Sequence, residues 1–276
     1  MLMAHARLYM VSRFFIGIKA GATIRSMDLE PLIKLHFARF EFKYLLQKSL
    51  RDDIEKELQY FMAFDPFVEN QPGYKYFVRS LYFDDPAYST YYDKIDGIHT
   101  RAKFRIRTYS PDPDAGVSTF LELKGRYNQL VFKHRVQCHL NGETARQSGE
   151  KLAPCIISCS DNATVLDQFH FECYRKRLKP VVLIDYLRRP YISKYDPEFR
   201  LTFDEKITGS RYPGLYPGPA ERAESILPGY TIMEVKFKYH MPAWFHRIIQ
   251  SFELRRQSIS KMCKGVEVCH LARNLE

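Results

Sequence analysis

The sequence predicts an α+β fold: a closed eight-stranded antiparallel β-barrel with helices packed on the outside. Three observations lead to this prediction. Several segments alternate charged and apolar residues with a period of two, which is typical of strands with one polar face. The polar faces of these segments carry many more bases than acids. Amphipathic helical segments lie between the strands and can cover the apolar faces.

The first half of the chain predicts five strands and two helices. We expect the strands at 37–46, 75–84, 101–107, 120–126 and 129–140. A helix is expected over 49–64, where Ser49 can cap the first turn and apolar residues recur at helical spacing. A shorter helix is expected over 86–96. Residues 111–116 and 141–151 are turn-rich or polar and predict loops.

The second half predicts three more strands, at 180–189, 199–206 and 230–239. Helices are expected over 162–178 and 242–254, and the Pro- and Gly-rich stretch 211–228 predicts a loop. The sequence contains neither internal repeats nor a clear domain boundary. We therefore expect one domain over 37–270, preceded by a loose leader at 1–36.

The charge balance indicates a polyanionic partner. The chain has 42 Lys and Arg residues against 32 Asp and Glu residues, a formal net charge of +10. This excess suits nucleic acid, an anionic membrane surface or a phosphate-rich small molecule. A nucleic-acid module would interleave aromatic and basic residues on an open face. Here the aromatic residues lie mostly opposite the charged faces, so we expect no nucleic-acid partner.

The apolar and cysteine content predicts a cytoplasmic protein without a transmembrane segment of its own. Bases interrupt the apolar stretch 1–22, and no later window is long enough to span a membrane. The six cysteines are scattered and lack the paired spacing of a zinc site, as expected for reduced thiols.

The charge pattern indicates which face of the sheet points inward. Exposure to solvent would explain the charged face of any single strand. Bases at alternate positions repel one another unless an anion lies over them, and one strand carries four on one face: Arg101, Lys103, Arg105 and Arg107. A closed sheet would place these faces around a lumen wide enough for a narrow ligand. Such a lumen must be wet or filled by a polyanion.

Several strand motifs carry a family resemblance. In chain order they are RFEFKYLL, VRSLYFDD, KFRIRTY, FLELKGRYN with KHRV, VLIDYLRRPY, RLTFDEKI, IMEVKFKYHMP and SISKMCKGVE. Together they resemble the VTC (vacuolar transporter chaperone) polyphosphate polymerase domain, a member of the triphosphate tunnel metalloenzymes, or CYTH-like superfamily. The resemblance implies an eight-stranded tunnel that binds a nucleoside triphosphate by its phosphate tail.

The resemblance and the charged strand faces together give the candidate site. The expected catalytic residues are Lys43, Arg105, Arg107, Lys124, Arg188 and Glu234. The expected substrate-binding residues are Arg39, Arg79, Lys103, Lys133, Arg135, Arg200, Lys236 and Lys261. The expected metal-binding residues are Glu234 and Glu41, for Mn²⁺ or Mg²⁺. The resemblance places Glu234 in contact with the metal, and Glu41 and Glu122 at other acid positions of the family. Arg188 could instead form a plain ion pair with Asp185 or Asp204.

The implied reaction is phosphoryl transfer between ATP and polyphosphate. The end of a phosphate chain attacks the γ-phosphorus of ATP, and ADP leaves while arginines and the metal neutralise the charge. The expected partners are ATP and polyphosphate or tripolyphosphate. A membrane-protein partner and the oligomeric state stay open.

Two other functions are compatible with the same fold: a triphosphatase, and a non-catalytic module that binds polyphosphate. Hydrolytic members of the superfamily typically carry paired glutamates on the first strand and further acids on a late one. Here Arg39 stands at the earlier first-strand position, and the last strand reads Glu234, Lys236, Lys238. The scarcity of carboxylates favours chain growth over hydrolysis.

Overall fold

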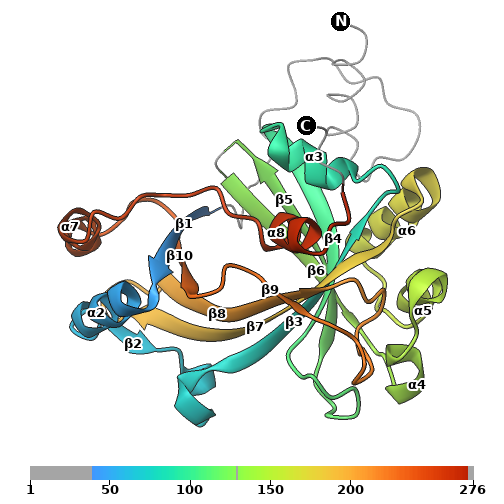
Figure 1. The fold of residues 1–276 in the computed structure, drawn as a ribbon, viewed down its shortest axis with the longest axis horizontal. Coiled ribbons are helices and arrows are strands. Elements are labelled where there is room, and N and C mark those ends of the chain that lie inside the picture. The colour runs from blue at the N-terminus through green and yellow to red at the C-terminus, as the bar shows by residue number, and fades with distance from the viewer. Residues whose placement is uncertain (1–38, 129, 273–276) are drawn as a thin grey trace, which may run out of the picture. The chain divides into compact units, whose positions relative to one another are not determined.

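The computed structural model describes residues 39–128 and 130–272, and within them it contains one ten-stranded antiparallel sheet (Figure 1). Eight strands follow one another in the order β1-β10-β8-β7-β3-β4-β5-β6, while β2 pairs with β7 and β9 with β8. The strands are β1 (Phe40–Gln47), β2 (Met62–Phe64), β3 (Tyr76–Asp84), β4 (Thr100–Thr108), β5 (Thr119–Tyr127), β6 (Leu130–Cys138), β7 (Lys179–Ser193), β8 (Arg200–Ser210), β9 (Glu224–Ser225) and β10 (Tyr230–Phe237). The predicted leader at 1–36 lies outside the described residues.

The helices lie between these strands. The α-helices are α2 (Lys48–Leu58), α3 (Ser89–Ile95), α4 (Gly142–Ala145), α5 (Leu152–Ser158), α6 (Thr164–Lys176), α7 (Ala243–Ser251) and α8 (Lys261–Val268). Short 3₁₀ turns are η1 (Pro66–Val68), η2 (Pro72–Tyr74) and η3 (Gly149–Lys151). Among the described residues, no helix is long and apolar enough to cross a membrane.

The sheet curls so that its two edge strands, β1 and β6, approach each other. Arg39 and Val131 form an isolated antiparallel bridge, with N–H···O distances of 3.3 Å from Arg39 and 3.2 Å from Val131. Among the described residues, this bridge is the only backbone pairing between the two edges of the sheet. The α+β class with an antiparallel sheet is confirmed, and closure of the barrel along its full length stays a prediction.

Side-chain contacts identify the inner face of the curled sheet. Glu41 on β1 and Lys124 on β5 are far apart in the strand order, yet Lys124 Nζ lies 2.9 Å from Glu41 Oε2. They can meet only because the sheet curls with this face inside. We call the face that carries Glu41, Lys124 and the residues aligned with them the inner face, and the opposite one the outer face.

The outer face is covered by helices, as predicted. Ile54 and Leu58 of α2, together with Phe245 and Ile248 of α7, pack against apolar residues of β1, β10, β8 and β7. Further along the outer face, Phe169 of α6 contacts Phe83 on β3 and Phe104 on β4. The predicted helix at 49–64 ends at Leu58, because Met62–Phe64 instead pairs with the projecting end of the long strand β7.

Helix α8 corrects the prediction that all helices pack outside. It was not predicted as a helix, and its Met262, Cys263 and Val266 pack with Val78, Tyr82, Ile184 and Tyr186 on the inner face. Gly265 allows this close approach, since a Cβ there would lie 2.3 Å from Ile184 Cδ1. Helix α8 therefore shares the inner face with the charged residues. Helices α4 and α5 were also not predicted.

Candidate functional site

Cations from six strands and α8 meet on the inner face. They are Lys43 (β1), Lys103, Arg105 and Arg107 (β4), Lys124 (β5), Lys133 (β6), Arg188 (β7), Lys236 (β10) and Lys261 (α8). Strand alternation and register bring them together: Lys103, Lys124 and Lys133 stand in one row across β4, β5 and β6. We call this set the cation cluster.

Four carboxylates lie among these cations, and each one is engaged. They are Glu41, Glu122, Asp204 and Glu234, and their side chains are at most 6% exposed. Nine cations thus face four carboxylates in a confined space. Unbalanced buried charge is costly unless a counter-anion is present, so the inner face is suited to a polyanion.

One group of contacts joins β1, β5 and β10. Glu41 accepts hydrogen bonds from Lys43 and from Lys124, whose Nζ lies 3.0 and 2.9 Å from the two carboxylate oxygens. Glu234 lies 2.5 Å from Lys236 Nζ and 3.5 Å from Lys43 Nζ. Burial raises the pKa of both carboxyls, but the lysines outweigh burial and hold each pKa far below its ordinary value. Burial lowers the pKa of Lys124 and of Lys236 to about 8.

A second group surrounds Arg105 and Arg107 on β4. Arg105 donates to Glu122 from Nε (2.8 Å) and Nη2 (2.6 Å), and from Nη1 to the Tyr82 hydroxyl (3.1 Å). Arg107 donates to the hydroxyls of Ser80 (3.1 Å) and Tyr186 (3.0 Å). Arg107 is thus held by two hydroxyls, and its Nη1 lies 4.0 Å from Glu122 Oε2, a longer contact than the one Arg105 makes.

A third group centres on Asp204. Arg188 donates to both of its oxygens, at 2.6 and 2.7 Å, and Lys261 Nζ lies 2.5 Å from Oδ2. The alternative of an ion pair between Arg188 and Asp204 is therefore present in the structure. The contact between Asp204 and Lys261 also anchors the start of α8 to the sheet, because Lys261 is the first residue of that helix.

Four predicted site residues do not join the cluster. Arg79 lies on the outer face: its neighbour Ser80 points inward to Arg107, while Arg79 pairs with Asp185 at 2.6 and 2.9 Å and donates to Leu215 O at 3.0 Å. Its expected place among the cations of the inner face is wrong, while its role in substrate binding stays a prediction. The other three, which are exposed, are Arg39, Arg135 and Arg200. Arg39 directly precedes β1 and Arg200 begins β8, whereas Arg135 stands opposite Glu122 within β6.

Sequence reasoning missed the polar groups that position these cations. Tyr82 and Tyr186 accept hydrogen bonds from arginines through their hydroxyls. The only indication in the sequence was that both stand at positions whose side chains point to the inner face. Thr202 was also missed: it stands opposite Glu234 in the β8–β10 register, and its buried hydroxyl has no hydrogen-bond partner among the described residues.

Glu41 and Glu234 suit a divalent metal only if the phosphates of a substrate supply further ligands. Among the described residues there is no group of three or more His, Cys, Asp or Glu side chains that could hold an ion. Glu234 lies close enough to Glu41 to raise the pKa of Glu41, and carboxylate oxygens are the donors that Mg²⁺ and Mn²⁺ prefer. Mg²⁺ is commonly bound by one or two carboxylates plus substrate phosphates, and this pair matches that pattern.

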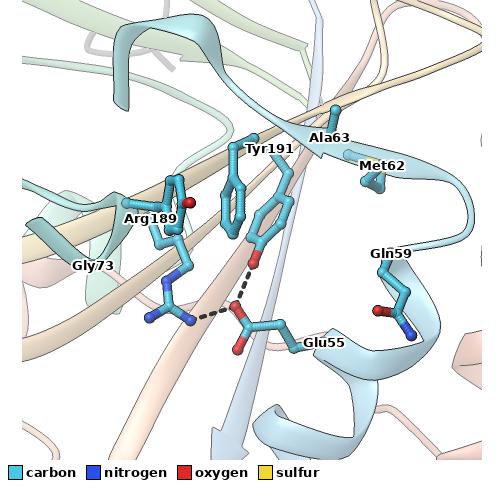
Figure 2. A pocket seen from close by; sticks show the side chains of 9 residues that line it. Glu55, Gln59, Met62, Ala63, Gly73, Arg189 and Tyr191 are labelled. Atoms are coloured by element: carbon cyan, nitrogen blue, oxygen red, sulfur yellow. Dashed lines mark hydrogen bonds and ion pairs between the residues drawn. The ribbon is translucent and has the colours of Figure 1, made fainter. Parts of the chain in front are cut away.

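A separate pocket of about 450 Å³ lies beside α2, β2 and β7 (Figure 2). At its polar end, Glu55 accepts hydrogen bonds from Arg189 and from the Tyr191 hydroxyl. Phe64 and Tyr74 stack at 4.1 Å in its wall. None of the predicted site residues lines this pocket, so it is distinct from the cation cluster.

Comparisons with known proteins agree with the resemblance. The sequence model of the VTC domain matches residues 38–270. No curated protein matches the chain. Among solved structures, the PH1819 protein of Pyrococcus horikoshii OT3 is similar, with a TM-score of 0.42 and 12% identity over 83% of this chain and 98% of that one. A candidate adenylate cyclase of Bacillus halodurans is also similar, with a TM-score of 0.46 and 14% identity over 79% and 91% of the two chains.

Proposed function

Because the chain belongs to the VTC domain family, we propose that it is a metal-dependent polyphosphate polymerase that transfers the γ-phosphate of ATP to a growing polyphosphate chain. The observation that carries the proposal is the cation cluster, in which nine cations surround four engaged carboxylates. We also propose that the sheet closes into an eight-stranded tunnel around the phosphates, with the Arg39–Val131 bridge on its seam.

The state of the acids favours chain growth over hydrolysis. A carboxylate that accepts a proton from water acts as a general base, and a general base works best when its pKa is near the working pH. Lysines hold the pKa of Glu41 and of Glu234 far below that range. The excess cations instead favour an anionic acceptor, the end of a phosphate chain.

The residues of the cluster divide the work of phosphoryl transfer. Arg105 and Arg188 are held by Glu122 and Asp204, so their positions are set before substrate arrives. Lysines on β1, β5 and β10 neutralise the phosphate oxygens and keep attacking and leaving groups in line. A divalent metal held by Glu234, with Glu41 beside it, would supply further positive charge at the oxygens of the transferred group.

The test is the fate of the γ-phosphate. The protein is incubated with ATP labelled in that phosphate and with Mn²⁺, and the label is followed into polyphosphate on a gel and into free phosphate. We expect label in chains that lengthen with time, together with release of ADP. Label in free phosphate alone would support the triphosphatase, and label in neither would support a binding module.

Glu234→Gln is the matched variant for this assay. The amide keeps the shape of the side chain but removes its negative charge, so we expect a loss of at least ~100-fold in turnover. Glu253→Gln, a change at an exposed residue outside the inner face, is the control and should leave turnover unchanged. Unchanged turnover in Glu234→Gln would remove the metal-binding role from this residue.

A further inference from the structure

Aromatic side chains replace the charged rows at one end of the inner face. Tyr109 follows β4 directly, and its ring centroid lies 5.8 Å from that of Tyr76 and 6.5 Å from that of Phe120. Phe67 of η1 continues the row, 5.2 Å from Tyr76. We call these four residues the rim arc. At the other end of the arc, the Arg135 guanidinium lies 4.7 Å from the Phe120 ring centroid.

Alternation along the strands places the arc on the inner face. Tyr109 stands two residues after Arg107, and Phe120 two residues before Glu122. Tyr76 is paired with Arg188 in the β3–β7 register. Each of these three rings therefore lies next to a charged residue of the site.

The arc is less covered than the apolar side chains beside it on the inner face. Helix α8 buries Val78, Ile184 and Tyr186, and Tyr76 and Tyr109 pack against the edge of this cluster. In the arc, Phe67 is 61% exposed, and Tyr76, Tyr109 and Phe120 keep part of their surface accessible. A contiguous, partly exposed aromatic surface beside a charged site is typical of a ligand-binding surface.

We propose that the rim arc is the platform on which the nucleobase of ATP stacks, while its phosphates extend inward over Arg107 and Arg188. The proposal rests on the proposed function. Tyr109 and Arg107 are two residues apart on an extended chain, ~7 Å, a span comparable with the ribose that separates base from phosphate. Stacking on aromatic rings does not depend on base identity, so the platform predicts binding of other nucleoside triphosphates as well.

The platform makes a prediction that the cation cluster alone does not. Tripolyphosphate has the phosphates of ATP but no base, so only ATP can use the rim arc. Tyr109→Leu combined with Phe120→Leu should weaken ATP binding by ~5- to 100-fold, the range expected for the loss of base stacking. Binding of tripolyphosphate should stay within a factor of about two of the unchanged protein, because phosphates do not stack on rings.

The experiment is calorimetric titration of both ligands, with Mg²⁺, into the unchanged protein, the double variant and two controls. Phe120→Trp keeps a stacking surface and should retain ATP affinity. Tyr174→Leu removes a ring that is 88% exposed on α6 and should change neither affinity.

The outcomes separate the two proposals. Equal losses for ATP and tripolyphosphate in the double variant, or unchanged ATP affinity, would overturn the platform and leave the proposed function intact. If Phe120→Trp lost affinity for both ATP and tripolyphosphate, the platform would also be overturned, because the Phe120 ring would then serve only to pack the fold. If the unchanged protein bound neither ligand, both the platform and the proposed function would be wrong.

Discussion

At the scale of single residues, neighbours position the arginines of the inner face before any phosphate binds. Glu122 holds Arg105 through two hydrogen bonds, and Asp204 holds Arg188 in the same bidentate manner. Ordering a long side chain costs conformational entropy. For these arginines the cost falls on folding, so that binding does not have to meet it again. The same acids lower the net charge, so that the empty inner face is stable enough to fold.

Tyr82 has an unusual environment for a tyrosine. Burial raises its pKa, but Arg105, Lys103 and Arg107 lower it more, to about 7. An acid whose pKa is depressed by folding stabilises the folded state above its unfolded pKa, and this contribution is lost as pH falls through the folded pKa. Between about pH 7 and the ordinary tyrosine value near 10, the free energy of unfolding should therefore rise with pH.

Tyr82→Phe tests this environment. The variant lacks the ionisable hydroxyl, so its free energy of unfolding should rise less between pH 7 and 9, by up to ~1 kcal/mol per pH unit. Urea denaturation at several pH values measures this difference, and tyrosinate absorbance near pH 8 should be weaker in the variant. Parallel pH profiles for the two proteins would contradict the assignment.

Thr202 gives a second prediction at this scale. Its buried hydroxyl lacks a hydrogen-bond partner among the described residues, which costs ~1–3 kcal/mol when no ligand supplies one. Thr202→Val keeps the branched shape that strands favour and should raise the free energy of unfolding by about 1 kcal/mol. Tripolyphosphate affinity should fall if the hydroxyl donates to phosphate. Thr202→Ser is the control, and a valine variant less stable than the original protein would contradict the account.

At the scale of elements, α8 depends on its contacts with the sheet. Its Ser260 cap accepts a hydrogen bond from Cys263 N at 3.3 Å, but a helix of eight residues is too short to be stable alone. Burial against β7 and β8 supplies the rest, and Lys261 ties the first turn to Asp204. Helix α8 thereby links core packing to the cation cluster.

Gly265→Ala tests this link. The added Cβ would lie 2.3 Å from Ile184 Cδ1 and 3.0 Å from Val182 Cγ2, both on fully buried residues. Overpacking should cost ~1–3 kcal/mol, more than the gain of about 1 kcal/mol from replacing glycine in a helix. We expect lower stability in urea and weaker tripolyphosphate binding. Gly218→Ala, where a Cβ would meet nothing within 4 Å, is the control, and equal behaviour of the two variants would contradict the link.

At the scale of the whole molecule, period-two alternation predicted the eight main strands of the sheet, but neither β2 and β9 nor every face. On β4 the charged side chains point inward, so charge identified the inner face correctly. On β3 the inner residues are Tyr76, Val78, Ser80 and Tyr82, because α8 covers that region. Arg79 was therefore assigned to the wrong face: its charge is neutralised outside by Asp185, a tertiary contact that alternation cannot reveal.

Other features depended on tertiary context in the same way. Strand β2 forms because β7 extends far enough to pair with it, and α8 forms because Gly265 lets it approach Ile184. The nine clustered cations were all predicted, since each stands in step with others along a strand or within a family motif. Their partners Ser80, Tyr82 and Tyr186 were not, because uncharged residues leave no distinct pattern.

The most direct test of the central claim is a crystal structure of the protein with Mn²⁺ and tripolyphosphate. We predict that the phosphates lie along the inner face within hydrogen-bond distance of Lys43, Arg107 and Lys124, and that the anomalous signal of manganese lies beside Glu234. Phosphates bound only outside, with the lysine–glutamate pairs of the inner face unchanged, would contradict the claim.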